Sequence, residues 1–154
     1  MKKYFLYTFI FLMMGGCKKY PEDDKFHLST VKCRLAGGLI NESKSWQPRS
    51  GYNFIINTDI PFSSSTDVIS FGRKGGFGGY MCNNYFNYSG IFVPTNSCNF
   101  RDGSWEFIDN KNKVKITDAN GVSGEFSIKK LDNDELWLQS DSILFKFKTI
   151  EKKH

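Results

Sequence analysis

The C-terminal third of the sequence alternates between apolar and polar positions, which is the pattern of half-buried β-strands. Three runs carry an apolar residue or glycine at every second position: Val114 and Ile116; Val122, Gly124, Phe126 and Ile128; Ile143, Phe145 and Phe147. Polar clusters at 109–112, 118–121, 132–134 and 140–142 separate the runs, and Asn120-Gly121 is a favoured dipeptide of tight hairpin turns. The pattern predicts four or five consecutive strands joined by short turns, which is an antiparallel meander.

A helical period occurs only once, ahead of the β pattern. Leu28, Val31 and Leu35 recur at helical spacing and predict a short helix, which Ser29 or Thr30 can cap. Beyond the glycine pair at 37–38, short runs rich in Phe, Tyr, Ile and Val alternate with turn-forming clusters, as in strands and turns. In these runs alternate residues share a face: Tyr52, Phe54 and Ile56; Ile69 and Phe71; Trp105 and Phe107.

The stretch from 39 to 150 has room for eight or nine strands, at about 6 residues per strand and about 4 per connection. A meander removes its exposed edges by closing on itself. We therefore predict an all-β domain over residues 28–154, in which the antiparallel meander closes into an up-and-down β-barrel. A two-sheet β-sandwich is the alternative, because the pattern is irregular over 60–95.

The first 17 residues carry the pattern of a bacterial export signal. Lys2 and Lys3 precede an apolar run at 5–14, which is too short to span a bilayer because a spanning helix needs about 20 apolar residues. Met14-Gly15-Gly16-Cys17 resembles a lipobox, in which small residues suit the signal peptidase and the cysteine thiol receives a diacylglyceryl group. We predict a signal helix at 1–16 and a palmitate-bearing anchor on Cys17. An ordinary signal peptide that contains a cysteine is the alternative.

The segment 17–27 is polar and charged with one proline, and we interpret it as a lipidated flexible tether. The formal net charge of +5 includes Lys2 and Lys3. Without the predicted signal, 19 basic residues face 16 acidic ones, so the mature chain is only mildly basic. An exported chain with this balance is not expected to bind nucleic acid. Its expected partner is the membrane, through the lipid on Cys17.

Two parts of the sequence resemble one known family. The start of the tether, Cys17-Lys18-Lys19-Tyr20-Pro21-Glu22-Asp23, resembles the lipocalin-like lipoproteins of the Bacteroidetes. Three segments near the C-terminus resemble that family's late strands: Gly103-Ser104-Trp105-Glu106-Phe107, Leu131, and Glu135-Leu136-Trp137-Leu138. The resemblance implies a lipocalin-like barrel, anchored by its lipid in the bacterial cell envelope, at the outer membrane. The acidic cluster at 22–24 is similar to the signal for display on the cell surface in that phylum; a solvated linker facing the periplasm is the alternative.

One position departs from the family pattern. Lipocalin-type chains usually open their first strand with Gly-x-Trp, and the tryptophan plugs the floor of the barrel. This sequence has Gly37-Gly38-Leu39 and no tryptophan before Trp46. The floor tryptophan is therefore expected to be absent or displaced.

Three cysteines remain when Cys17 carries lipid, and an odd number leaves at least one thiol unpaired within the chain. Cys82 and Cys98 flank an aromatic segment in a compartment that permits disulfides, so we predict that they pair, leaving Cys33 over. The alternative is that all three cysteines are unpaired and are buried as small apolar side chains.

The aromatic segment between those cysteines is the candidate ligand site. Tyr80, Tyr85 and Tyr88 lie among asparagines, and flat rings beside amides suit stacking on sugars or lining a ligand mouth. The alternative is an ordinary strand and loop whose rings pack in the core.

Candidate catalytic groups are few. After removal of the signal, the two histidines are His27 in the tether and His154 at the end, so nucleophilic catalysis has no placed base. The run Asp132-Asn133-Asp134-Glu135 begins like a calcium loop, but Trp137 stands where the turn glycine is required. We predict no enzyme activity, no metal and no cofactor. The expected role is binding a small, partly apolar ligand in the barrel; the alternative is a surface module with a filled core that binds a glycan or protein.

Overall fold

The computed structural model describes residues 19–23, 29–37, 43–60, 62, 67–84 and 94–150, with the backbone alone at 81–84 and 94–101. The described elements are one short helix, one 3-10 turn and nine strands: α2 (Val31–Ala36), β1 (Ser43–Asn53), β2 (Thr58–Ile60), β3 (Val68–Gly72), β4 (Gly76–Asn84), β5 (Pro94–Ile108), η1 (Asp109–Lys111), β6 (Lys113–Asp118), β7 (Ser123–Leu131), β8 (Glu135–Gln139) and β9 (Ile143–Thr149). The predicted signal helix and Cys17 lie outside the described residues. None of the helices in the described part has the length and apolar character that a membrane crossing requires.

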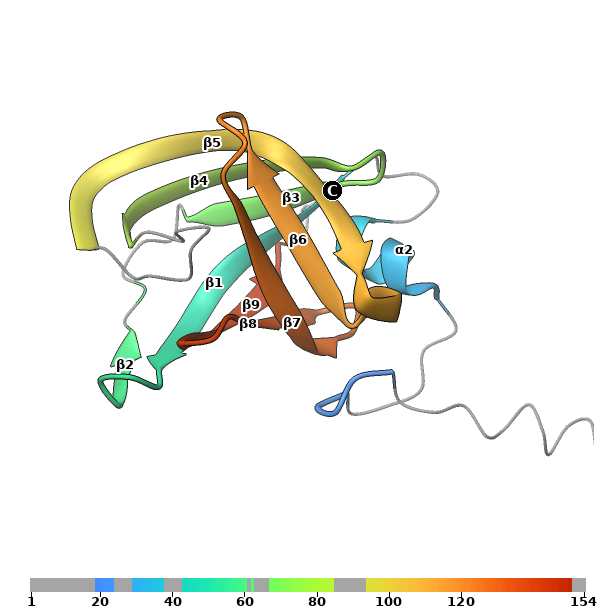
Figure 1. Cartoon of the computed structure of the whole chain (residues 1–154), viewed down its shortest axis with the longest axis horizontal. Helices are drawn as coiled ribbons and strands as arrows, with labels where there is room; N and C mark the ends of the chain where they lie inside the picture. The colour runs from blue at the N-terminus through green and yellow to red at the C-terminus, as the bar shows by residue number, and fades with distance from the viewer. Residues whose placement is uncertain are drawn as a thin grey trace, which may run out of the picture.

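The strands form one closed antiparallel barrel (Figure 1). From β3 to β9 each strand pairs with the next in sequence, and β9 returns to pair with β1 over residues 46–53. The other edge of β1 is shared, because its first half pairs with β3 and its last three residues pair with β2. Eight strands thus close the barrel. The extra strand, β2, pairs with the end of β1, on the same edge of β1 as β3. The predicted up-and-down barrel is confirmed, and the sandwich is excluded by the β1–β9 pairing.

The late strands follow the predicted alternation. In β6, Val114 and Ile116 are buried between half-buried neighbours. In β9, Ile143, Phe145 and Phe147 are buried, and the two residues between them are half-buried. The turn before β7 has Gly121 at φ +81°, and the Asp118 carboxylate accepts hydrogen bonds at 2.9 Å from the backbone N–H groups that follow it. Short local turns therefore fix the register of these strands.

The first strand ends earlier than its pattern predicts. Tyr52, Phe54 and Ile56 were expected on one face, but β1 stops at Asn53 and a turn follows. The Asn53 side-chain oxygen accepts hydrogen bonds from the N–H groups of residues 55 and 56, at 2.9 and 3.3 Å. This local bonding competes with strand pairing. The prediction of a strand through 56 is therefore wrong, and Phe54 and Ile56 are exposed in the turn.

The predicted short helix is present as α2, and it closes one end of the barrel. Thr30 caps it, its hydroxyl accepting a hydrogen bond from the Cys33 N–H at 3.2 Å. Trp46, on β1, is fully buried, and its indole N–H donates to the carbonyl of Leu35 in α2 at 2.9 Å. The tryptophan that was expected to be absent or displaced is displaced along the sequence, because β1 begins only at Ser43 and carries Trp46, outside a Gly-x-Trp motif, at this end. We call this end the floor and the opposite end the mouth.

Candidate functional site

The inside of the barrel is lined with apolar side chains. Buried residues from all eight strands of the barrel face one another there: Trp46, Ile69, Phe71, Phe77, Trp105, Val114, Ile116, Phe126, Ile128, Leu136, Leu138, Ile143, Phe145 and Phe147. Phe71 contacts Trp105 edge-to-face at a centroid distance of 5.6 Å, and the Trp105 indole N–H is satisfied by the Gly72 carbonyl at 2.8 Å. These side chains form the hydrophobic core of the barrel.

Two neighbouring glycines show which side of β4 faces the interior. A Cβ added at Gly79 would meet Ile69 and Val68 at 3.6 Å and Phe77 at 3.9 Å, which are ordinary contacts inside the barrel. A Cβ at Gly78 would meet the Asp102 carboxylate at 3.8 Å, on the outer face. A side chain at position 79 would therefore enter the interior of the barrel, and one at position 78 would lie outside it.

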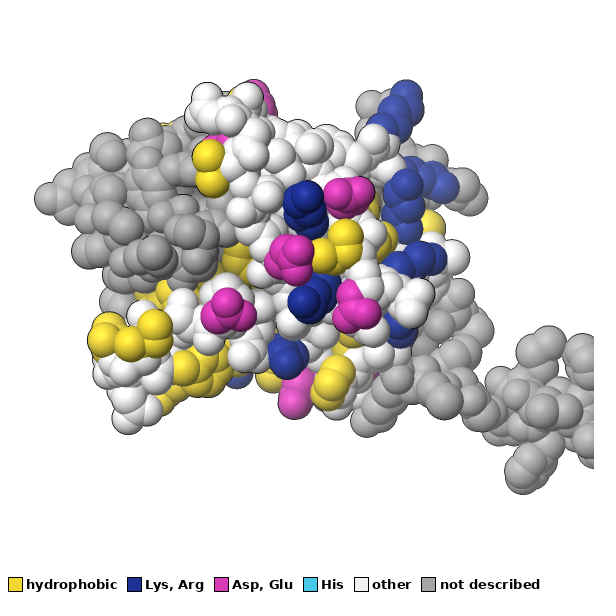
Figure 2. All heavy atoms as spheres, viewed as in Figure 1, with side chains coloured by type: hydrophobic (Ala, Val, Ile, Leu, Met, Phe, Trp, Pro, Cys, Tyr) yellow, Lys and Arg dark blue, Asp and Glu magenta, His cyan; other side chains and the backbone are white. Residues whose placement is uncertain are grey.

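The mouth carries exposed apolar side chains. The turn between β1 and β2 exposes Phe54, Ile55 and Ile56, with Ile55 77% exposed, and Val122 is exposed in the turn before β7. Figure 2 shows the hydrophobic tip of the β1–β2 turn standing clear of the barrel. At the same end, Asp67 is fully buried just before β3. The mouth therefore presents apolar side chains to its surroundings.

The three predicted ligand tyrosines do not come together in the described structure. Tyr80 is 41% exposed and alternates with the buried residues Phe77 and Gly79, so its ring lies on the outer face of β4 and not in the lining. Tyr85 and Tyr88 lie outside the described residues.

The predicted cysteine pair lies on adjacent strands. Cys82 of β4 and Cys98 of β5 are direct Cα partners in the antiparallel register. Such partners lie about 4.5–5.5 Å apart, within the range of about 4.4–6.8 Å that a disulfide spans. Cys33 is a free, half-buried cysteine on α2. The register is compatible with the predicted bond, which stays a prediction.

Thiol titration checks the disulfide. In denaturant without reductant, the lipidated chain should show one free thiol, that of Cys33, and reduction should expose Cys82 and Cys98 as well. A Cys33→Ser chain should show none before reduction, which serves as the matched control. Three free thiols before reduction would exclude the bond. Since the bond would close a loop of 15 residues, reduction should lower the free energy of unfolding by about 3 kcal/mol.

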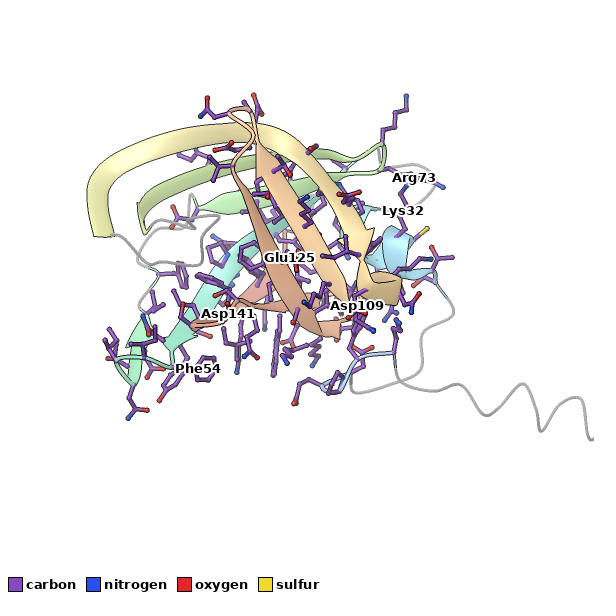
Figure 3. All side chains as sticks on the ribbon, viewed as in Figure 1. Lys32, Phe54, Arg73, Asp109, Glu125 and Asp141 are labelled. Carbon is purple, nitrogen blue, oxygen red and sulfur yellow. The ribbon has the colours of Figure 1, made fainter. Side chains whose placement is uncertain are left out.

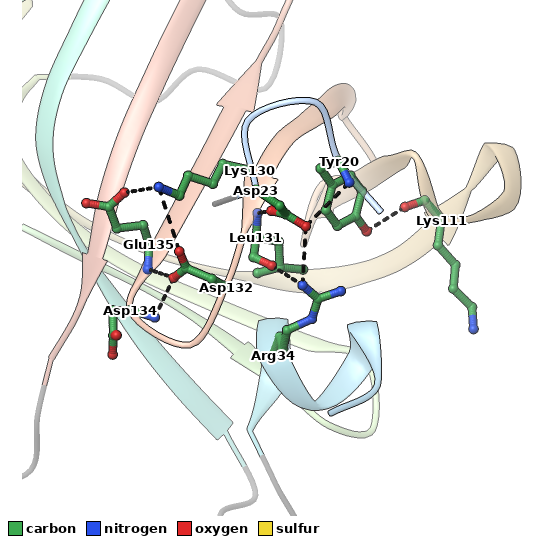
Figure 4. Close-up of polar contacts among 9 residues, drawn as sticks. All are labelled: Tyr20, Asp23, Arg34, Lys111, Lys130, Leu131, Asp132, Asp134 and Glu135. Carbon is green, nitrogen blue, oxygen red and sulfur yellow. Dashed lines mark hydrogen bonds and ion pairs between the residues drawn. The ribbon is translucent and has the colours of Figure 1, made fainter. Parts of the chain in front are cut away.

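The floor carries a buried polar network that joins the N-terminal segment to the barrel (Figure 4). Asp23 is 1% exposed and its carboxylate accepts a hydrogen bond from the Leu131 N–H at 2.9 Å. Arg34 of α2 is 4% exposed; it forms an ion pair with Asp23 at 3.4 Å and donates to the Leu131 carbonyl. The Arg34 Nη1 is thus shared between two acceptors, whereas the buried Arg34 Nε has no hydrogen-bond partner. We call Tyr20, Asp23, Arg34 and Leu131 the floor latch.

Tyr20 completes the floor latch. Its ring is 2% exposed, its hydroxyl donates to the Lys111 carbonyl at 2.8 Å, and the Arg34 guanidinium lies 5.9 Å from its ring centre. Burial raises the pKa of the Tyr20 hydroxyl above its ordinary value. The next residues are also fixed, since the Glu22 N–H donates to the Lys129 carbonyl at 3.1 Å. Residues 19–23 are therefore packed on the barrel, which differs from the flexible tether expected there.

A second polar group surrounds the turn between β7 and β8. The Asp132 carboxylate accepts from the N–H groups of Asp134 and Glu135, at 2.7 and 2.6 Å, and Lys130 pairs with Glu135 at 2.8 Å. These bonds make the calcium-like run a structural turn. Nearby, Lys44 donates to the carbonyls of Arg34 and Asn133 at 2.8 and 2.7 Å, and burial lowers its pKa to about 8.

Comparisons with known proteins identify the fold. No family model matches the sequence, and no curated protein matches it. A crystal structure of a lipocalin-like protein from Bacteroides uniformis is similar over 76% of this chain and 99% of its own, with a TM-score of 0.52 and 14% identity. An uncharacterized protein from Bacteroides eggerthii is similar over 69% of this chain and 97% of its own, with a TM-score of 0.51 and 14% identity. The resemblance predicted from the sequence is confirmed for the fold, and the chain is a lipocalin-like β-barrel.

Proposed function

We propose that this protein is a lipid-anchored component of the bacterial cell envelope that binds a small, partly apolar molecule in its barrel without catalysis. One observation carries the proposal: an apolar-lined barrel is closed at its floor by α2 and Trp46 and bears exposed apolar side chains at its mouth. A ligand bound there would gain by burying apolar surface, at about 25 cal/mol per Å². The lipocalin-like fold fits such a role.

The anchor is proposed on separate grounds. Met14-Gly15-Gly16-Cys17 has the residues of a lipobox, and the described chain begins two residues later. Two or more acyl chains on Cys17 would hold the protein stably on a membrane. We propose the outer membrane as its location, with the acidic cluster at 22–24 supporting surface display.

A second function is favoured by Tyr80. Its exposed ring on the outer face of β4, near the mouth, suits contact with a glycan or a protein partner at the surface. In that case the barrel core would be filled, and binding would not depend on interior space.

An apolar fluorescent probe separates the two functions. N-phenyl-naphthylamine should bind residues 17–154 carrying Cys17→Ser saturably, and several long-chain fatty acids should displace it. Gly79→Leu, which directs a side chain into the interior, should weaken the probe by about tenfold or more. Gly78→Leu, its neighbour on the outer face, is the matched control and should leave the affinity unchanged. A folded protein that excludes the probe, but binds a glycan array through Tyr80, would contradict the barrel site.

A further inference from the structure

The floor latch fixes the distance between the barrel and the predicted lipid. Lys19 is the first described residue, and its ammonium group donates to the Asn110 carbonyl and to the Asn112 side chain, both at 3.0 Å. Cys17 lies two residues earlier, and two residues span at most about 7 Å. A lipid on Cys17 would therefore place η1 and the rest of the floor at the surface of the bilayer, with no long tether between them.

The floor is also the basic end of the molecule. Exposed or half-buried cations come to it from four separate elements: Lys19 before the latch, Lys32 on α2, Arg73 and Lys74 in the β3–β4 turn, and Lys111 in η1. Figure 2 shows Lys and Arg side chains gathered along this end, and Figure 3 labels Lys32 and Arg73 there. The exposed or half-buried acids at this end are Glu22, Asp109, Asp134 and Glu135, and Glu135 is paired with Lys130, so unpaired cations outnumber unpaired acids in this set.

The mouth has the opposite charge. Its turns and the strand residues beside them carry Asp59, Asp118 and Asp141, and Figure 3 shows Asp141 and Phe54 far from Lys32 and Arg73. A charged membrane surface acts over about 8–10 Å at physiological salt, so it would attract the floor without repelling the mouth.

We propose that the floor is a membrane-contact surface whose partner is the anionic headgroup layer of the bilayer that holds the lipid of Cys17. This inference rests on the proposed lipidation. The latch and the basic side chains together hold the barrel upright, with α2 and η1 against the headgroups and the mouth directed away from the membrane, open to ligand.

Fluorescence quenching in vesicles tests this orientation. The full chain, lipidated by its bacterial host, is reconstituted in vesicles of phosphatidylcholine with phosphatidylglycerol that contain a headgroup spin label. A fluorophore on the native Cys33 of α2 should be quenched at least about threefold more than one on Ile55→Cys in a Cys33→Ser chain, because only the floor lies within the headgroup layer. Equal quenching at the two sites, or stronger quenching at position 55, would overturn the proposal.

Variants separate the two causes of the orientation. Two variants should each reduce quenching at Cys33. Asp23→Asn removes the negative charge that pairs with Arg34 in the floor latch, and the double variant Lys32→Glu with Lys74→Glu reverses two charges of the basic end. Lys115→Glu on the barrel wall is the matched charge control and should leave it unchanged. Palmitate labelling and vesicle flotation are read in the same samples. Labelled, floating protein with equal quenching overturns only this inference, whereas unlabelled protein that does not float overturns the lipidation as well.

Discussion

Replacing Asp23 with alanine should lower the free energy of unfolding by about 3–5 kcal/mol, which is a large share of the stability of a domain of this size. The substitution leaves the Arg34 guanidinium buried without its carboxylate, and it leaves the Leu131 N–H without the acceptor that lies at 2.9 Å. Removing one partner of a buried ion pair is costly for this reason, whatever the net contribution of the intact pair. Urea unfolding of residues 17–154 carrying Cys17→Ser, followed by circular dichroism, measures the change.

Two comparisons show whether the effect comes from the buried pair. Glu22→Ala alters the adjacent, exposed carboxylate and should change the free energy of unfolding by no more than about 0.5 kcal/mol. The double variant Asp23→Leu with Arg34→Met should recover most of the loss, because two apolar side chains replace two charges. A cost for Asp23→Ala equal to that of Glu22→Ala would mean that residues 19–23 are not docked on the floor in solution.

The second large effect is expected at Trp46. Trp46→Ala should lower the free energy of unfolding by about 3–5 kcal/mol, because it removes the largest of the fully buried side chains and leaves a cavity between β1 and α2. It also removes the indole N–H that holds the Leu35 carbonyl, and the ring over which the Lys44 ammonium lies at 4.2 Å. The same urea titration measures it, and amide hydrogen exchange in α2 should accelerate in parallel.

Trp137 is the matched comparison for Trp46. It lies half-buried on β8, with the ammonium groups of Lys146 and Lys130 at 4.1 and 5.3 Å from its ring, so its loss should cost only about 1 kcal/mol. Trp46→Phe keeps most of the buried volume but leaves the Leu35 carbonyl unpaired, and should cost about 1–3 kcal/mol. Equal costs for Trp46→Ala and Trp137→Ala would show that Trp46 does not close the floor.

The late strands could be predicted because their causes are local. Each alternating run in β6, β7 and β9 is bounded by a turn whose bonds join residues a few positions apart, as Asp118 does for the turn ending at Gly121. The end of β1 was missed for a related reason. The apolar alternation continues through Ile56, but the Asn53 side chain bonds the following backbone and ends the strand.

The floor could not be predicted because its contacts join distant parts of the chain. The Asp23 carboxylate and the Leu131 N–H are 108 residues apart, and no period in the sequence signals such a contact. A tyrosine within a charged spacer was the one unusual feature, and Tyr20 proves to be buried. The family spacing Gly-x-Trp at Gly37 could not show where Trp46 lies, because the first strand begins six residues later.

The pairing of β1 with β9 has a consequence for how the chain reaches its structure. Trp46 and Thr149 are register partners about a hundred residues apart, so the barrel cannot close until β9 has been synthesised. The Asp23–Leu131 contact waits for a similar length of chain. Local hairpins among β6–β9 can form early. The edge of β1 that pairs with β9 stays unpaired until β9 is available. A chain that is cut within β9 should therefore keep two open strand edges and aggregate.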